Sequence, residues 1–168
     1  RHNRHKAQIE FYADFLAADD KLLSACRRAH VHDSLRIPIQ SCTPQALSLA
    51  GRNWFDFDTV RNTASHVMKH FPSTWGEIIV GLPGDDYEGI KASIKWCAEN
   101  GLPQVRCHRL KSLPGSEYTR RPEIYGIVAD DTPPHAIYRS NTFSYDEILL
   151  AEDLNRNYQL IAPFIRTF

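Results

Sequence analysis

The spacing of hydrophobic and polar residues changes along the chain and divides it into alternating predicted strands and helices. Strands with one apolar face and one polar face show strict alternation, and three stretches do so: 7–14, 35–41 and 104–110. A β-branched run, Ile78-Ile79-Val80, predicts another strand. The sequence therefore predicts four strands separated by helical segments.

The intervening stretches carry apolar residues at helical spacing. Helices are expected at 19–30, from Thr43-Pro44 to about 50, from Asp56 to about 71, and from Asp85 or Asp86 to about 100. A short helix is expected at 117–125, and an extended or irregular run at 130–141. Ser144 and Glu147 have the spacing of a capping box, which predicts that the last helix begins there. Its expected buried stripe is Leu150, Leu154, Tyr158, Ile161 and Ile165.

A strand–helix unit repeated four times predicts parallel strands joined by right-handed crossovers. Parallel strands covered by helices on both faces are apolar throughout, whereas in these strands most residues at every second position are polar. We call the two sets of alternating positions the apolar parity and the polar, or lumen, parity. The polar parity includes Gln8, Glu10, Tyr12, Asp14, Arg36, Gln40, Glu77, Arg106 and His108. We therefore expect an α/β fold, a partial parallel (β/α) barrel of about four units with a C-terminal helix and a polar lumen. The alternative is that the polar face packs on another domain or faces water.

The stretch Gly76–Asp86 is the expected floor of a site. Its strand ends in Gly81-Leu82-Pro83-Gly84, and two aspartates then open a helix. The glycines allow the backbone to pass close to another group. Ligands of parallel α/β proteins bind at the carboxyl ends of the strands, which is where this turn lies.

Composition and charge limit the kinds of binding partner that the sequence favours. The chain has 168 residues and a formal net charge of zero, so nothing in its charge favours a nucleic acid or a membrane surface. No apolar run is long enough to span a bilayer, and no signal peptide is evident, so a cytoplasmic location is expected. The basic, polar run at Arg1–Lys6 indicates a cut within a longer protein.

The four cysteines (Cys26, Cys42, Cys97, Cys107) form no CxxC pair and are expected to be structural thiols.

Four ordered segments resemble the radical S-adenosylmethionine (SAM) superfamily, especially its members with an amino-terminal cobalamin-binding domain. The first is Leu35–Ser41 followed by Thr43–Leu47, and the second is Glu77–Gly84. The third is Leu113–Glu117 after a strand. The fourth is Pro133-Pro134 ahead of Leu149–Leu154, with Tyr125-Gly126-Ile127 between the third and the fourth.

The resemblance implies a (β/α) barrel that binds SAM and a [4Fe-4S] cluster, with cobalamin as a further cofactor of the parent protein. In the family, a CxxxCxxC loop holds the cluster, and a glycine-glycine-acid segment meets the methionyl end of SAM. This sequence has neither, and it also lacks the aspartate–histidine–glycine cobalamin motif. The resemblance thus covers the carboxyl-terminal part of the barrel, as residues 1–130, with an extension and capping helix at 131–168. The implied partners are the missing amino-terminal half, a cobalamin-binding domain and a small-molecule substrate.

The resemblance also assigns cofactor-binding positions. Gln40 and Ser41 occupy the place that meets the ribose and methionyl part of SAM, and Ile79 and Gly81 lie where a strand contacts the adenine. The glycine–isoleucine–glycine–acid motif of that strand is half present, since Glu77 and Gly84 replace its outer members. Leu110 ends the strand that touches adenine largely through its backbone. Strand alternation, which does not depend on the family resemblance, also puts these positions on the predicted lumen face: Gln40, Ile79, Gly81 and Leu110.

The remaining polar lumen positions are candidates for substrate or catalytic contacts. His108, Tyr12 and Glu10 are the catalytic candidates, and Asp14, Arg36 and Arg106 are the substrate candidates. An imidazole titrates near neutral pH, so His108 could transfer protons. Its alternative role is a lumen histidine bonded to Glu10 or Glu77, and Tyr12 has packing as its alternative.

One further pattern concerns metals. His66 and His70 are four residues apart on a predicted helix, as two zinc ligands are. No glutamate follows His66 and no third ligand is evident, so a solvated helix face is the favoured interpretation and no metal is expected.

The resemblance thus implies the carboxyl-terminal portion of a cobalamin-dependent radical SAM enzyme. This portion would form part of the SAM pocket and the substrate wall for reductive SAM cleavage or for methyl transfer to an unactivated carbon. Without the cluster cysteines, this segment is not expected to be active alone. A radical SAM enzyme without cobalamin, methylthiotransferase-like or porphyrinogen-oxidase-like, is an alternative. A non-catalytic α/β module that binds a partner or ligand is another.

Overall fold

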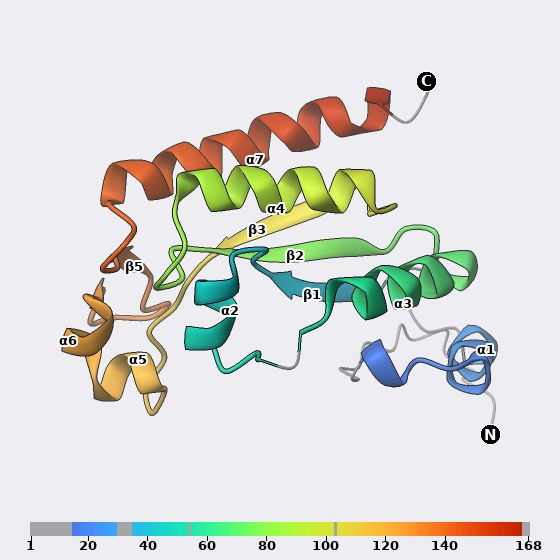
Figure 1. Ribbon diagram of the computed structural model, residues 1–168, viewed down its shortest axis with the longest axis horizontal. Coiled ribbons are helices and arrows are strands. Elements are labelled where there is room, and N and C mark those ends of the chain that lie inside the picture. Colours follow the sequence, from blue (N-terminus) through green and yellow to red (C-terminus); the bar gives the residue numbers. More distant parts are fainter. Residues whose placement is uncertain (1–14, 30–34, 54, 103, 166–168) are drawn as a thin grey trace.

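The computed structural model describes residues 15–29, 35–53, 55–102 and 104–165. The strand expected at 7–14 lies outside these residues, together with the candidates Glu10, Tyr12 and Asp14. Within the described part, a short 3-10 helix (η1, Phe15–Ala17) precedes helix α1 (Asp20–Arg28). Figure 1 shows a central sheet with long helices packed along it and smaller elements at one end.

The three long strands form one parallel sheet in the order β1-β2-β3. They are β1 (Arg36–Gln40), β2 (Trp75–Val80) and β3 (Val105–Arg109). Helices α2 (Pro44–Leu49) and α3 (Phe57–His70) connect β1 to β2, and α4 (Tyr87–Glu99) connects β2 to β3. The fold is therefore α/β with parallel strands and helical crossovers, as the sequence predicts.

Capping residues begin most of these helices where the sequence places them. The carboxylates of Asp19 and Asp56 accept hydrogen bonds from the backbone N–H groups of Leu22 and Thr59. Asp86, the second of the two aspartates, caps α4 by accepting from the N–H of Gly89 at 2.8 Å. Thr43 precedes α2, but its hydroxyl makes no cap bond, because it donates to Asp85 instead.

The segment after β3 builds a small second layer. It contains α5 (Glu117–Arg120), α6 (Pro122–Tyr125), β4 (Val128–Ala129) and β5 (Ile137–Arg139), with β4 and β5 antiparallel. The single helix expected at 117–125 is thus two short helices. The reason is Pro122, which disfavours helical geometry at Arg121, whose φ is −138°. The run expected to be irregular at 130–141 includes the short strand β5.

Helix α7 (Tyr145–Ile165) begins with the predicted capping box. Glu147 accepts from the backbone N–H of Ser144 at 2.9 Å, and the Ser144 hydroxyl lies 3.3 Å from the backbone nitrogen of Glu147. The predicted buried stripe is partly wrong. Leu150 and Ile161 are more than half exposed, while the buried positions are Ile148, Ala151 and Ala162. The helix has more apolar residues than its contact face holds, so apolar spacing alone did not identify that face.

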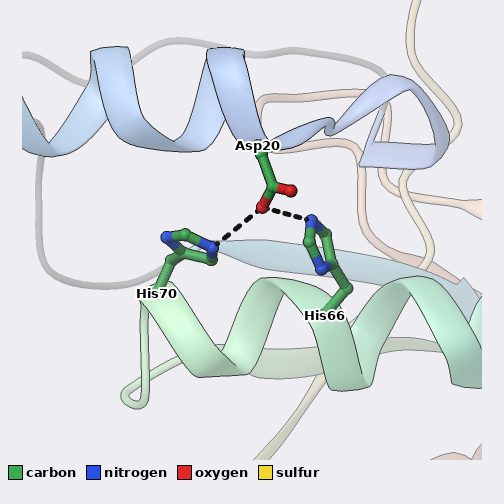
Figure 2. A group of neighbouring side chains, drawn as sticks. All are labelled: Asp20, His66 and His70. Atoms are coloured by element: carbon green, nitrogen blue, oxygen red, sulfur yellow. Dashed lines mark ion pairs between the residues drawn. The ribbon is translucent and has the colours of Figure 1, made fainter.

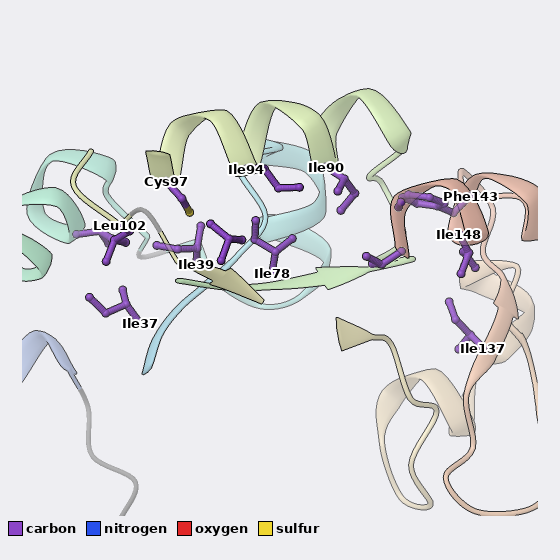
Figure 3. Packing of buried hydrophobic residues seen from close by; sticks show 14 of the residues in the cluster. Ile37, Ile39, Ile78, Ile90, Ile94, Cys97, Leu102, Ile137, Phe143 and Ile148 are labelled. Atoms are coloured by element: carbon purple, nitrogen blue, oxygen red, sulfur yellow. The ribbon is translucent and has the colours of Figure 1, made fainter. Parts of the chain in front are cut away.

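One hydrophobic cluster joins the sheet to its helices (Figure 3). Five residues of the predicted apolar strand face are buried: Ile37, Ile39, Ile78, Val80 and Val105. Cys107 on that face is only half-buried, and Trp75 on the other face is buried too. Helices α3, α4 and α7 contribute to this same cluster, and so does β5 through Ile137. The described residues after 130 therefore share a core with the rest of the described chain. In the described part of the chain, no helix is long and apolar enough to cross a bilayer.

Candidate functional site

The predicted SAM-contacting residues lie near the carboxyl ends of the three parallel strands. Gln40 is the last residue of β1, Ile79 is the penultimate residue of β2, and Leu110 follows β3 directly. All three are half-buried, so part of each side chain is accessible. Parallel strands end at the same edge of the sheet, and this edge is where ligands of such folds bind.

Gln40 has an unusual backbone conformation. Its φ is +68°, in the left-handed region that residues other than glycine rarely adopt. The backbone N–H of Ser41 donates to the carbonyl of Ile39 at 2.9 Å, so Gln40 is the central residue of a three-residue turn. The pairing register of β1 with β2 shifts at the same point. Strain of this kind costs about 1–3 kcal/mol and tends to occur at functional sites.

A buried carboxylate holds this turn in place. Asp85, 1% exposed, accepts a hydrogen bond from the Ser41 hydroxyl at 2.8 Å and one from the Thr43 hydroxyl at 2.7 Å. The Ser41 oxygen in turn accepts from the backbone N–H of Thr43 at 2.9 Å. We call Asp85, Ser41 and Thr43 the Asp85 network. It ties the loop after β1 to the loop after β2.

Burial determines the titration of Asp85. Desolvation raises the pKa of its carboxyl above the ordinary value, while the hydrogen bonds from Thr43, Ser41 and the Asp86 N–H oppose that rise. Sequence reasoning considered Asp85 only as a possible helix cap. The available signal was the pair Asp85-Asp86, because one helix start needs only one cap.

Ser41 and Gly81 are both buried within the chain. The Ser41 side chain is fully buried and its hydroxyl is used by Asp85, so it positions the turn rather than lining an open surface. Gly81 has φ +92°, and a Cβ there would lie 2.6 Å from the Cδ1 atom of Ile137. A larger residue at Gly81 would therefore disturb the core first, so this position is a poor probe of adenine contact.

The backbone N–H and carbonyl of Leu110 both form hydrogen bonds within the chain. Its N–H donates to the carbonyl of Val80 at 2.9 Å, and its carbonyl accepts from the N–H of Ile137 at 3.1 Å. The half-buried side chain is therefore what Leu110 offers most directly to a ligand.

The open face of the sheet carries a group of charged residues from all three strands. Glu77 on β2 lies between Arg36 on β1 and His108 on β3, with its Oε1 atom 3.7 Å from Arg36 Nη1 and 3.6 Å from His108 Nε2. Arg106 on β3 stacks over the Trp75 ring at 4.0 Å from its centroid. We call Arg36, Glu77, Arg106 and His108 the open-face group. The structure thus brings together His108 and Glu77, one of its two expected partners.

This face and the carboxyl edge together have a defined chemistry. The open-face group offers a carboxylate, an imidazole and two guanidinium groups, and the adjacent edge offers the apolar side chains of Ile79 and Leu110. Ile79 pairs in register with His108, so the apolar and polar parts adjoin. The arrangement suits a ligand with an apolar ring and polar or anionic substituents.

The cysteines do not suit an iron–sulfur cluster. All four are free, and no two are spaced as in the cluster loop. Cluster ligands must be thiolates, but burial raises the pKa of Cys42 to about 11 and that of Cys107 to about 12. Burial also raises the pKa values of Cys26 and Cys97. The described residues therefore provide no cluster site.

Comparisons with known proteins place this fold. No known family profile matches the chain. It is 23% identical over 141 residues to a probable threonylcarbamoyladenosine tRNA methylthiotransferase from Pyrococcus abyssi, covering 83% of this chain and 31% of that protein. Its structure is similar to coproporphyrinogen III oxidase (HemN) from Escherichia coli, a radical SAM enzyme. The TM-score is 0.55 and the identity 17%, with 88% of this chain and 30% of that one covered.

The likeness to HemN shows that the partial α/β fold is shared, as predicted. The chain spans about a third of the length of each of these two proteins. Neither comparison concerns cobalamin.

Proposed function

We propose that this chain forms the carboxyl-terminal part of the barrel of a radical SAM enzyme and supplies part of its SAM pocket. The observation that carries the proposal is the strained turn at Gln40, held by the Asp85 network at the carboxyl edge of the sheet. A buried network that maintains an unfavourable backbone conformation at a ligand-binding edge indicates that the position of Gln40 matters for binding. The similarities to two longer enzymes support the same assignment.

The residues at this edge fit the nucleoside part of SAM. The half-buried side chains of Ile79 and Leu110 offer an apolar surface for adenine, and Gln40 offers an amide for ribose or methionyl oxygens. The Asp85 network orients Gln40 through Ser41. SAM bound to a reduced [4Fe-4S] cluster supplies a 5′-deoxyadenosyl radical. The cluster ligands would come from another part of the parent protein, since the cysteines described here do not suit them.

The open-face group would form the substrate wall. Arg36 and Arg106 would bind anionic groups of a small-molecule substrate, and His108 would donate or accept a proton at its Nε2 atom. Glu77 lies 3.6 Å from that atom and would help to hold the imidazole ring in place. Radical chemistry needs water excluded, and the apolar residues beside this group would contribute to that.

The finer proposal is that the parent depends on cobalamin and transfers a methyl group. The second candidate is a radical SAM enzyme without cobalamin. The similarities to a methylthiotransferase and to coproporphyrinogen III oxidase fit this candidate in part, and no better than they fit the first. The coding sequence on the amino-terminal side of Arg1 separates the two. An aspartate–histidine–glycine motif there would support cobalamin, and its absence would support the second candidate.

The coding sequence on the amino-terminal side of Arg1 also tests the radical SAM proposal as a whole. We expect it to encode a CxxxCxxC loop about two strand–helix units before Ala7. A reading frame without any such loop would overturn the radical SAM assignment and leave a non-catalytic α/β module that binds a ligand or partner.

Ile79 provides a test of the pocket itself. We expect Ile79→Asn in the complete protein, with its cluster reconstituted, to weaken SAM binding about tenfold or more, because the apolar contact with adenine is lost. Anaerobic calorimetry with SAM measures this. The matched control is Ile161→Asn on the exposed surface of α7, which should leave the affinity unchanged. Unchanged affinity in Ile79→Asn, with folding intact, would overturn the assignment of this edge.

A further inference from the structure

Three possible metal ligands meet at the contact between helices α1 and α3, and none of them belongs to the open-face group. They are Asp20 on α1 and His66 and His70 on α3 (Figure 2). The Asp20 Oδ1 atom lies 3.4 Å from His66 Nε2 and 3.3 Å from His70 Nε2. Each residue has a ligand atom within 4.8 Å of those of the other two. The third ligand that the sequence did not reveal is therefore supplied by α1.

These separations match a tetrahedral metal site. Zinc binds imidazole nitrogens at about 2.0–2.1 Å and carboxylate oxygens at about 2.0–2.2 Å, so two of its ligands lie about 3.3–3.5 Å apart. The two Asp20–histidine distances already have this value. An ion placed among the three atoms would need only the two imidazoles to turn toward each other.

The fold fixes the elements that carry the ligands. Leu23 and Cys26 of α1 pack against Val67 and Phe71 in a separate hydrophobic cluster. Residues four apart lie on the same helix face, which aligns His66 with His70 beside this contact. The side chains of His66 and His70 are 35% and 22% exposed, so they are held by packing yet open to an ion from solvent.

We propose that Asp20, His66 and His70 bind a divalent transition-metal ion, with Zn²⁺ the best match, and water in the fourth position. Two imidazoles and one carboxylate favour zinc or its neighbours over Mg²⁺ or Ca²⁺, which prefer oxygen ligands. Val67 follows His66 where a zinc hydrolase with the HExxH motif has its glutamate base, so this helix does not supply that base. The bound ion would link α1 to α3. This inference does not depend on the proposed radical SAM function.

Zinc binding by the full 168-residue chain tests the proposal. His2 and His5 are first changed to Ala to remove other histidines that could bind metal, and Zn²⁺ affinity is measured by competition with a chromophoric chelator. We expect binding of one equivalent. Asp20→Asn and His70→Gln should each weaken it by more than about 100-fold, since even the loss of a residue that only supports a ligand costs 10–100-fold.

Spectroscopy and a control variant make the result specific. Co²⁺ should give the intense visible bands of a tetrahedral site, and Asp20→Asn should change them. His135→Gln, at a histidine that faces the backbone carbonyl of Asp130, should bind zinc as the parent does. Asp20 is 78% exposed, so its substitution leaves the fold intact.

Two outcomes would overturn the proposal. Zinc binding that is equally tight in His70→Gln would show that the ion lies elsewhere. Loss of binding in the histidine variants but not in Asp20→Asn would show that Asp20 only forms ion pairs.

Discussion

Two carboxylates near the sheet, Asp85 and Glu77, have opposite surroundings. Asp85 is buried and receives two hydroxyl hydrogen bonds at 2.7 and 2.8 Å. Glu77 is 19% exposed, and its nearest cationic partners, Arg36 and His108, lie at 3.7 and 3.6 Å. One carboxylate is closely bonded within the protein, whereas the other has loose partners on an open face.

This difference suggests that Asp85 positions other residues, whereas Glu77 is available for ligand binding. A buried polar group must be fully hydrogen-bonded, and a network that achieves this fixes its surroundings. The Asp85 network therefore positions the Gln40 turn. A partly exposed carboxylate whose ion pairs are long contributes little to stability and can exchange its partners for a ligand. We expect mutations in the Asp85 network to affect stability, and mutations in the open-face group to affect function.

The largest expected effect is that of Asp85→Ala. It removes the acceptor for the hydroxyl hydrogens of buried Ser41 and half-buried Thr43, so the free energy of unfolding should fall by about 3 kcal/mol. Asp86→Ala is the matched control, since it removes only a helix cap and should cost about 1 kcal/mol. Chemical denaturation measures both. Equal losses in the two variants would contradict a special role for Asp85.

Gly89→Ala should have the next largest effect. A Cβ at Gly89 would overlap the Asp85 Oδ1 atom and lie 2.5 Å from the Thr43 hydroxyl oxygen. The network must shift to admit it, and we expect a loss of about 2 kcal/mol. Gly101→Ala is the control, because Gly101 has φ +81° but no atom within 4 Å of the added Cβ, so only backbone strain of about 1 kcal/mol applies. A smaller loss at Gly89 than at Gly101 would show that the network tolerates crowding.

Asp85 also predicts a pH dependence. Its pKa is raised in the folded state above the ordinary 3.8, so the folded protein binds more protons than the unfolded one between these two values. The free energy of unfolding contributed by Asp85 should therefore fall as pH rises through this window. Asp85→Asn removes the titrating group and should remove this slope. Denaturation curves of both proteins across the acid range measure it, and parallel pH profiles would contradict the raised pKa.

The sequence predicted the sheet well because its signals are local. Strand alternation placed Ile37, Ile39 and Ile78 on the buried face, and Glu77 and His108 on the opposite one, as the structure has them. The caps at Asp56 and Ser144 were also confirmed, since a cap depends on residues only three apart.

The rest depended on contacts between distant segments. The bond between Ser41 and Asp85 spans 44 residues, and no spacing rule predicts it. Asp20 likewise meets His66 only because α1 packs on α3. The buried side of α7 was misassigned at Leu150 and Ile161 for the same reason, since the sheet and α4 decide which side of the helix is covered.

Glu77→Gln should have the smallest effect on stability and the clearest effect on function. Its two ion pairs are longer than 3.5 Å, so the free energy of unfolding should change by less than about 0.5 kcal/mol. In the complete protein, SAM affinity should stay unchanged, because the predicted adenine contacts are at Ile79 and Leu110. Turnover should fall, because His108 loses the carboxylate beside its Nε2 atom. Denaturation, SAM calorimetry and turnover together measure these three quantities. A destabilisation as large as that of Asp85→Ala would show that Glu77 is also structural, and the contrast between the two carboxylates would fail.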